Sequence, residues 1–356
     1  MAPPRILLTG ATGYVGGSVL SQVLNSSKFS IKPDAITAVV RRPGDANLLK
    51  EKGIRTLLVG SLDDLEALTA AAASHDIVIN TSTGFHTASA KALISGLGNR
   101  TDPSQEVHFL HLSGTSNISR QDITKRWPEL RTFSDQSDDL YEYEKQRESH
   151  DTYPQRATDI AVVELGIKAA VKTYIVQPPL IYGRGSGFFN KQSQQIPTLI
   201  RNAVKNGYAG YVGDGTSNIG NVHVADVARL FEQLVASILA GQSPPAGRQG
   251  FYFANTGTQT WIETVAHIGT VGFELGVLKD AKARSISLQQ AAEQIFNGDE
   301  DLTENVFASS SSSKAEKAAQ LGWKPQETGK SLGDVIRETF QDLLRDNDLD
   351  KPLILK

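Results

Sequence analysis

The sequence predicts an α/β fold, with a doubly wound parallel sheet and a smaller mixed α/β domain at its C-terminal side. Two observations predict it. Over the first ~180 residues, short apolar runs alternate with amphipathic segments, and this alternation gives a parallel sheet covered by helices on both faces. The first apolar run, 5–9, ends in a glycine-rich stretch, as a buried strand that feeds a helix does.

Each element of the first half follows from its local pattern. Short runs rich in aliphatic residues predict strands, and longer segments with helical spacing predict helices. Asp63 stands where it can cap the third helix. The predicted strands are 5–9, 36–40, 55–59, 77–80, 107–112 and 173–176, and the predicted helices are 15–24, 46–52, 64–73, 87–95 and 156–170.

The second half breaks this rhythm at Pro178 and Pro179, after which a glycine-rich loop leaves the sheet. One more strand and helix are predicted at 222–224 and 226–239, and an amphipathic helix at 332–344. Five serines at 309–313 predict an exposed loop. We therefore expect a nucleotide-binding domain over 1–180, with 218–240 returning to it, and a smaller substrate-binding domain over 181–217 and 241–356.

Composition excludes several classes of protein. The 356 residues carry a net charge of −3, which argues against a binder of nucleic acid or of an anionic membrane. The chain has no cysteine, so disulfides, thiol catalysis and cysteine-ligated metals are excluded. The seven histidines show no metal-ligand spacing with carboxylates, and we predict no metal. No signal peptide or apolar span is visible, so we expect a cytoplasmic protein.

The glycine-rich stretch after the first strand has the spacing G-x-x-G-x-x-G. The first glycine permits a tight turn, the second lets a pyrophosphate approach the backbone, and the third allows close helix–strand packing. This context predicts a Rossmann-type dinucleotide site rather than a plain turn. The expected cofactor-binding residues are Gly10, Thr12, Gly13, Tyr14, Val15 and Gly16.

Two arginines, Arg41 and Arg42, follow the second strand where an acidic residue would favour NAD. Guanidinium groups suit a 2′-phosphate, so we predict NADP(H), with NAD(H) as the less favoured alternative. Asn80, Thr81 and Ser82 follow the fourth strand, and we expect them to line the cofactor at the carboxyl edge of the sheet.

Four motifs in order resemble the extended, epimerase/dehydratase-type branch of the short-chain dehydrogenase/reductase superfamily, with some likeness to fungal NmrA-like proteins. Gly10–Gly16 resembles its G-A-T-G-x-x-G turn. The segment 177–183 is similar to R-P-x-x-V-Y-G, with Gln177 in place of arginine. The segments 222–228 and 314–325 resemble V-H-V-x-D-V-A and K-A-x-x-L-G-W-x-P.

The resemblance implies a catalytic tyrosine with a lysine four residues later, and a hydroxyl residue after the fifth strand. Tyr141 and Lys145 fit this spacing, and Thr115 or Ser113 fits the hydroxyl. An adjacent ammonium would bring the pKa of the phenol nearer to neutral pH. The resemblance also places three residues beside the nicotinamide, namely Pro178, Pro179 and Ile181.

Alternatives to this catalytic pair stay open. The chain from Lys145 to strand 173–176 is longer than the resemblance implies, and the polar segment 146–154 predicts a loop. Counting back from that strand places the tyrosine position near 151–153, where Tyr153 has Arg156 and Ala157 after it. Tyr141 and Lys145 can instead be an exposed helix turn, and NmrA-like proteins lose the pair.

The sequence therefore predicts an NADP(H)-dependent oxidoreductase or epimerase acting on a carbonyl or hydroxyl of a small metabolite. Tyr182, Phe188 and Phe189 in the exit loop suggest that this substrate is partly apolar. The alternative is an NADP(H)-binding regulator, or an enzyme that uses the fold without redox chemistry. Members of the extended branch often dimerise, so the resemblance leaves a homodimer open.

Overall fold

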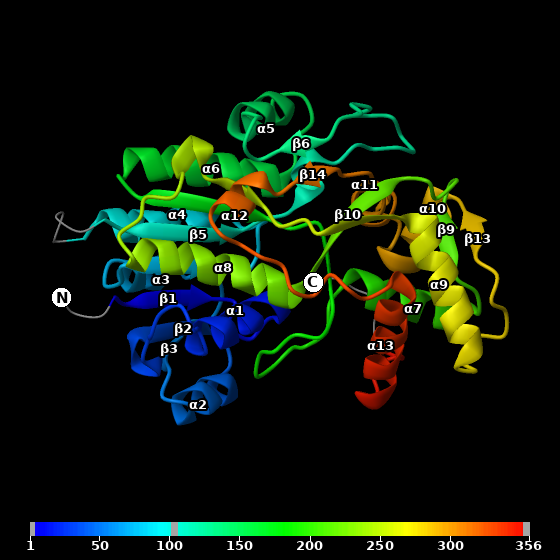
Figure 1. Cartoon of the computed structure of the whole chain (residues 1–356), viewed down its shortest axis with the longest axis horizontal. Helices are drawn as coiled ribbons and strands as arrows, with labels where there is room; N and C mark the ends of the chain where they lie inside the picture. Colours follow the sequence, from blue (N-terminus) through cyan, green and yellow to red (C-terminus); the bar gives the residue numbers. More distant parts are fainter. Residues whose placement is uncertain (1–3, 101–105, 352–356) are drawn as a thin grey trace.

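A computed structural model describes residues 4–100 and 106–351, with a seven-stranded parallel sheet at its centre (Figure 1). The strand order is β11-β7-β5-β4-β1-β2-β3. The chain winds one way from β1 to β3 and the other way from β4 onward, so the switch point lies between β1 and β4, where such sheets bind ligands. The strands are β1 (Ile6–Thr9), β2 (Ile36–Val40), β3 (Arg55–Leu58), β4 (Ile77–Asn80), β5 (His108–Leu112), β7 (Lys172–Gln177) and β11 (Phe251–Phe253).

Helices cover both faces of this sheet (Figure 1). Side chains alternate along each strand, so Ile6 and Leu8 enter the core under α1 and α8, whereas Leu7 enters the core on the opposite face. The prediction of a doubly wound parallel sheet is confirmed. The helices around it are α1 (Tyr14–Leu24), α2 (Pro43–Glu51), α3 (Leu65–Ala72), α4 (Thr87–Gly98), α5 (Leu140–Glu148), α6 (Pro154–Lys168), α8 (Val224–Leu239) and α12 (Glu316–Gln320).

A smaller lobe stands beyond the carboxyl edge of the strands (Figure 1). It contains a three-stranded sheet of β8 (Leu180–Tyr182), β10 (Asn218–His223) and β12 (Gly257–Thr260), and a two-stranded sheet of β9 (Gly210–Val212) and β13 (Arg284–Ile286). Its helices share a third apolar core. They are α7 (Gln195–Asn206), α9 (Trp261–Glu274), α10 (Leu288–Ile295), α11 (Glu300–Phe307) and α13 (Leu332–Arg345).

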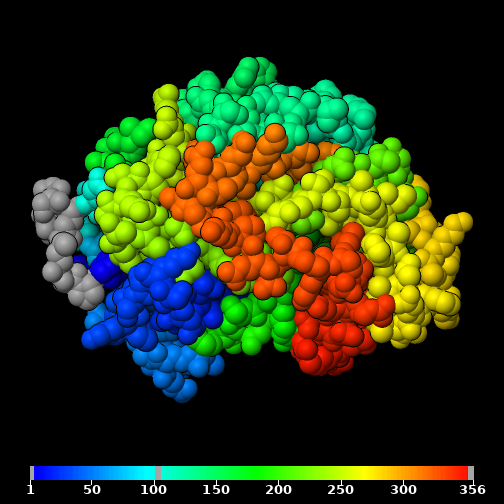
Figure 2. Space-filling view, in the orientation of Figure 1, coloured from blue at the N-terminus to red at the C-terminus, as the bar shows by residue number. Residues whose placement is uncertain are grey.

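The two parts are interleaved more than the sequence predicts. β11 lies in the segment assigned to the smaller domain, yet it pairs with β7 as an edge strand of the large sheet. α12 and the stretch after it, orange in Figure 2, cross the face of the molecule between the two parts. The predicted division therefore omits a strand, because a run of three aromatic residues is too short for its sheet to be recognised from sequence.

The prediction that Ser309–Ser313 is an exposed loop is wrong. Ser309, Ser310, Ser311 and Ser313 are buried. Main-chain bonds join Ser310 to Arg120 and Ser311 to Asn218, and the end of the tract pairs as β14 (Ser313–Lys314) with β6 (Phe133–Ser134). A serine tract is buried here because its backbone is hydrogen-bonded on both sides, which composition does not reveal.

None of the helices in the described ranges has the length and apolar character needed to cross a membrane.

Candidate functional site

The turn between β1 and α1 is held by contacts that only glycine permits. Gly10 has a φ of +80°, and a Cβ there would lie 2.5 Å from the carbonyl oxygen of Thr81. A Cβ on Gly16 would lie 2.2 Å from the carbonyl oxygen of Gly10. Packing against the β4 loop therefore requires glycine at both ends of the turn.

The N-terminus of α1 is available to an anion. Gly13 stands at its N-cap without a side-chain hydrogen bond, and its first turn holds no acidic residue. Thr12 and Gly13 are only partly buried. Because free amides at a helix N-terminus attract phosphate, the turn fits the diphosphate of a dinucleotide. The side chains of Tyr14 and Val15 instead make contacts within the protein. The Tyr14 hydroxyl donates to the Gly183 carbonyl at 2.6 Å, and Val15 packs against the core.

The residues after β4 support the turn from behind. The Thr81 hydroxyl donates to the Thr9 carbonyl at 2.6 Å, and the Asn80 side-chain oxygen accepts from Thr9 Oγ1 at 2.5 Å and from Ser82 Oγ at 2.9 Å. Asn80 and Thr81 are buried, and Ser82 is partly exposed. Their side chains are thus occupied within the protein, so any contact of Asn80 or Thr81 with a cofactor falls to the backbone.

The two arginines after β2 differ in their surroundings. Arg42 Nε donates to Asp45 Oδ2 at 2.8 Å, and this carboxylate raises the pKa of the guanidinium. Arg41 is exposed, and it forms no ion pair with any of the residues that the structure describes. Arg41 is therefore the guanidinium free to meet a phosphate beyond the end of β2.

Tyr141 and Lys145 lie together on α5, but away from the carboxyl edge of the sheet. The Tyr141 hydroxyl and the Lys145 ammonium both donate to Glu164 Oε1, at 3.0 and 2.9 Å. Glu164 lies about 13 Å further along α6 than Gln155, at 1.5 Å per residue. The Tyr141 ring is buried against the core under α6, and Arg248 covers it. The predicted pair exists, but the structure does not bring it to the glycine turn.

The two hydroxyls expected after β5 are buried and occupied. Ser113 Oγ donates to Asp159 Oδ2 at 2.6 Å. Thr115 Oγ1 lies 3.0 Å from Ser311 Oγ, inside the contact between the serine tract and the sheet. Neither hydroxyl is presented to a substrate in this arrangement. The neighbouring Ser116, which the sequence analysis did not single out, is only partly buried.

A different set of polar groups meets at the N-terminus of α6. Pro154 begins this helix and Tyr153 is its N-cap. Ser116 Oγ donates to Gln155 Oε1 at 2.5 Å, and Ser116 lies near enough to the Tyr153 phenol to lower its pKa. The Gln155 amide lies against the loops after β4 and β5, since a Cβ on Gly84 would be 2.9 Å from Gln155 Nε2. Tyr153, Ser116 and Gln155 therefore stand at the ligand-binding edge of the sheet.

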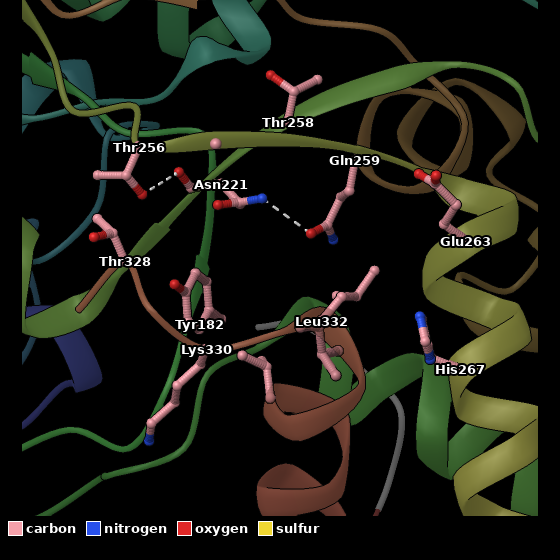
Figure 3. Close-up of a pocket in the computed structure, with 13 residues that line it drawn as sticks. Tyr182, Asn221, Thr256, Thr258, Gln259, Glu263, His267, Thr328, Lys330 and Leu332 are labelled. Atoms are coloured by element: carbon pink, nitrogen blue, oxygen red, sulfur yellow. Dashed lines mark hydrogen bonds between the residues drawn. The ribbon is translucent and has the colours of Figure 1, made fainter.

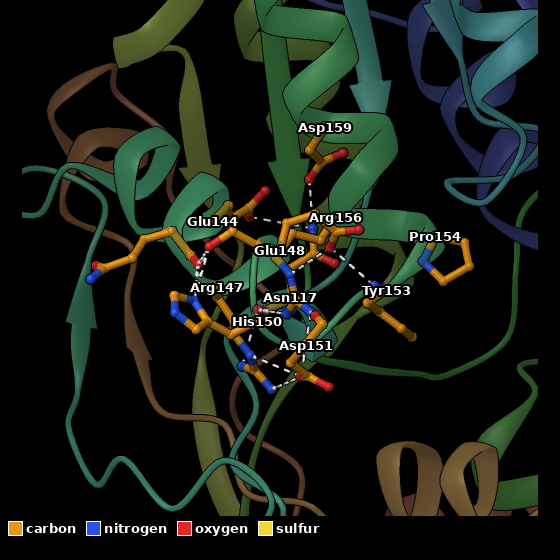
Figure 4. A network of polar contacts seen from close by, with 12 residues as sticks. Asn117, Glu144, Arg147, Glu148, His150, Asp151, Tyr153, Pro154, Arg156 and Asp159 are labelled. Carbon is orange, nitrogen blue, oxygen red and sulfur yellow. Dashed lines mark hydrogen bonds and ion pairs between the residues drawn. The ribbon is translucent and has the colours of Figure 1, made fainter.

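Two buried arginines lie next to this cluster. Arg147 and Arg156 each donate to the carbonyl oxygen of Asn117, at 3.2 and 3.0 Å, and both pair with Asp151 (Figure 4). Arg156 also lies 5.7 Å from the centre of the Tyr153 ring. Burial raises the pKa of Tyr153, while Ser116 and the two guanidiniums oppose that rise. Tyr153 is thus a protonated phenol, and the guanidiniums of Arg147 and Arg156 lie near it.

Beneath the cluster, two buried carboxyl groups share donors. Gln177 Nε2 donates to Glu144 Oε1 at 2.6 Å and to Asp159 Oδ2 at 3.0 Å, and Asn117 Nδ2 bridges the same oxygens. Burial raises the pKa of Glu144 well above its usual value and that of Asp159 to about 7. Gln177 replaces the arginine of the resembled motif, and its amide serves this acid pair.

The two phenylalanines of the exit loop do not stand free to face an apolar substrate. Phe188 and Phe189 pack against the core under α1, and Lys52 lies 4.5 Å above the Phe188 ring. Asn190 N donates to the Thr12 carbonyl at 3.4 Å. The two phenylalanines are therefore no basis for an apolar substrate. Pro178 and Pro179, by contrast, are buried where the chain leaves the large sheet, with Ile181 partly buried after them.

A cavity of about 350 Å³ opens in the smaller lobe between β12, α9 and α13. Figure 3 shows Glu263 and His267 reaching it from α9, while Asn221 and Gln259 bond to each other across one wall. Tyr182 lines it as well, on the face of β8 opposite to Ile181. This cavity lies apart from the glycine turn.

Comparison with known proteins agrees with the geometry of the turn. Residues 10–124 match a family model described as NAD(P)H-binding. The oxidase ucsJ of an Acremonium species is 29% identical over 304 residues, covering 81% of this chain and 84% of that protein. The protein C2A9.02 of Schizosaccharomyces pombe is 26% identical over 322 residues, covering 90% of this chain and 95% of that protein.

Solved structures match nearly the whole chain. DesIV, a dTDP-glucose 4,6-dehydratase from Streptomyces venezuelae solved with NAD, has a TM-score of 0.67 at 16% identity and covers 98% of this chain and 100% of its own. A UDP-glucuronic acid 4-epimerase from Bacillus cereus has a TM-score of 0.60 at 13% identity, covering 95% and 99%. At such identities the likeness concerns the fold, and the NmrA-like branch stays a prediction. Residues 10–124 thus match an NAD(P)H-binding domain, and the whole chain has the fold of these dehydratase and epimerase structures.

Proposed function

We propose that this protein is an NADP(H)-dependent oxidoreductase that acts on a carbonyl or hydroxyl of a small metabolite, with Tyr153 as its acid/base. The observation that carries the proposal is the position of Tyr153 as N-cap of α6, two residues before Gln155, which accepts from Ser116, on the sheet edge that also bears the glycine turn. Thr12–Gly16 would hold the diphosphate and Arg41 the 2′-phosphate. The cofactor supplies or accepts the hydride when bound.

In the reductive direction, Tyr153 donates its phenolic proton to the substrate oxygen as the carbonyl carbon becomes a carbinol. The phenolate that remains is stabilised by the Arg156 guanidinium 5.7 Å from the ring centre, and it regains a proton from solvent. Gln155 Oε1 accepts a hydrogen bond from the Ser116 hydroxyl at 2.5 Å, which leaves the Ser116 oxygen as an acceptor for a substrate hydroxyl. In the oxidative direction the deprotonated phenolate of Tyr153 accepts the proton of the substrate hydroxyl.

The test compares two tyrosines. Tyr153→Phe is expected to lower kcat for NADPH-dependent carbonyl reduction by roughly 10²- to 10⁴-fold, the usual worth of a positioned acid. Its Kd for NADPH should stay unchanged. Tyr141→Phe is the matched control, because it removes a hydroxyl that bonds to Glu164 away from the turn, and it should leave kcat within about twofold.

The reverse pattern, with activity lost in Tyr141→Phe and kept in Tyr153→Phe, would restore the Tyr141–Lys145 pair and reject our assignment. Cofactor binding without turnover in the unaltered protein would favour the second candidate, an NADP(H)-binding regulator or non-redox enzyme. One observation favours that candidate: Ala157, rather than lysine, stands four residues after Tyr153.

A further inference from the structure

An aromatic side chain stands exposed beside the proposed acid/base. Phe85 is 48% exposed, in the loop after β4, at the edge of the sheet that carries the glycine turn. Its ring meets the Tyr153 ring edge-to-face, with centroids 5.7 Å apart and an interplanar angle of 89°. Phe85 therefore offers apolar surface next to the hydroxyl that would transfer a proton.

The loop fixes Phe85 from both sides. The Phe85 amide donates to Thr83 Oγ1 at 3.1 Å. The next residue, His86, caps α4 by accepting from the Ser89 amide at 3.2 Å, and its Nε2 lies 3.1 Å from Asp63 Oδ1. Because the Phe85 amide and the His86 side chain are both hydrogen-bonded, the ring is held at the surface and does not turn into the core.

The charges near Tyr153 do not suit an anionic substrate. Arg147 and Arg156 are fully buried and are taken up by Asp151, by Glu148 and by the Asn117 carbonyl. Arg126, further out, pairs with Asp151 and Asp301. Since these guanidiniums are buried or already bonded to carboxylates, they offer no free donor to an anionic substrate, and the exposed group at this end of the site is the Phe85 ring.

We propose, on the basis of the proposed function, that Phe85 determines specificity by stacking on a planar, uncharged aryl or conjugated carbonyl substrate. The substrate carbonyl then reaches the Tyr153 hydroxyl while its ring lies on the open surface of Phe85. This geometry favours a planar ring over a saturated ring of the same size, because offset stacking rewards flat π-systems beyond their apolar area.

The test measures binding of 2-acetylnaphthalene and of its saturated decalin counterpart to the protein saturated with NADP⁺, through the shift in Tm. The aryl ketone should bind about 2- to 12-fold more tightly than the saturated one, the range expected for an aromatic pair. In Phe85→Leu, which keeps apolar area without a ring, the ratio should fall to about one. Phe273→Leu is the control, since Phe273 on α9 is 53% exposed.

Equal binding of the two ketones, an unchanged ratio in Phe85→Leu, or no binding of either ketone would overturn the proposal. Tm of the cofactor-free variants checks that both remain folded. These outcomes are separate from failure of the proposed function, which would appear as no Tm shift with NADPH or as full turnover in Tyr153→Phe.

Discussion

At the scale of single residues, neighbours of the same type have different roles. Arg41 and Arg42 are adjacent in sequence, but only Arg42 has a carboxylate partner, Asp45. A guanidinium already bonded to a carboxylate has less to gain from a phosphate than one that is bonded only to water. The proposed preference for NADP(H) should therefore rest on Arg41.

Arg41→Ala is expected to raise the Kd for NADPH by about tenfold or more, the worth of a hydrogen bond to a charged group, and to leave the Kd for NADH nearly unchanged. Arg42→Ala should change both by less than about threefold. Fluorescence titration of each variant with the two cofactors measures this. Equal loss of NADPH and NADH affinity in Arg41→Ala would show that Arg41 does not read the 2′-phosphate.

The buried pair of Glu144 and Asp159 links stability to pH. Burial raises the pKa of Glu144 well above its usual value and that of Asp159 to about 7, so the folded protein holds a proton that the unfolded chain has released. The stabilisation is complete below the unfolded pKa of about 4 and is lost as pH rises through the folded value.

Glu144→Gln is therefore expected to flatten the decline of Tm between pH 5 and pH 8, since an amide resembles the protonated acid and carries no charge at any pH. His111 Nε2 lies 3.5 Å from Asp159 Oδ1 and remains in both proteins, as does His108; burial lowers the pKa of each to about 4. Glu142→Gln, on the exposed side of α5, should keep the slope of the unaltered protein. A parallel slope in Glu144→Gln would contradict the shared proton.

At the scale of elements, the loop from Gly183 to Gln192 makes contacts with both α1 and α13. Its Gly187 packs backbone to backbone against Gly17. Arg184 and Gln192 bind Asp346, at the end of α13, at 3.0 and 3.1 Å. The glycine spacing that the sequence shows in this loop thus serves close contact with α1.

Gly187→Ala should lower the free energy of unfolding by about 1–3 kcal/mol, the usual cost of overpacking, because the new Cβ would lie 2.7 Å from Gly17 Cα and neither backbone has room to yield. Gly329→Ala meets no atom within 4 Å and should stay within about 0.5 kcal/mol. Urea unfolding compares them. If the two alanines cost the same, the loop is not held against α1.

Most strands of the sheet and helix α6 were predictable, but the position of Tyr141 relative to the sheet edge was not. Ile77–Asn80 appears where its apolar run predicts it, because a strand buried on both faces has a purely local signature. The pair Tyr141 and Lys145 fits its motif because any helix places residues four apart on one face. Pro154 stands in the first turn of α6 and makes Tyr153 its N-cap, and this proline decides which helix begins at the site after β5.

At the scale of the whole molecule, the missing predictions share a cause. Glu144, Asp159 and Gln177 come from two helices and a strand, and only their packing shows that they meet. β11 and the serine tract acquire their structure from partners far away in sequence. The cofactor turn could be located from sequence because its requirements lie within seven consecutive residues, whereas these features have no local pattern to read.

The buried tract around Ser311 also sets an order for the folding of the protein during its synthesis. Thr115, which follows β5, completes its contact only with a serine 196 residues later in the chain. A ribosome adds roughly 5–20 residues per second, so Ser311 is synthesised on the order of ten seconds or more after Thr115. The large sheet can begin to assemble early, but the contact between its edge and the serine tract forms only when synthesis is nearly finished.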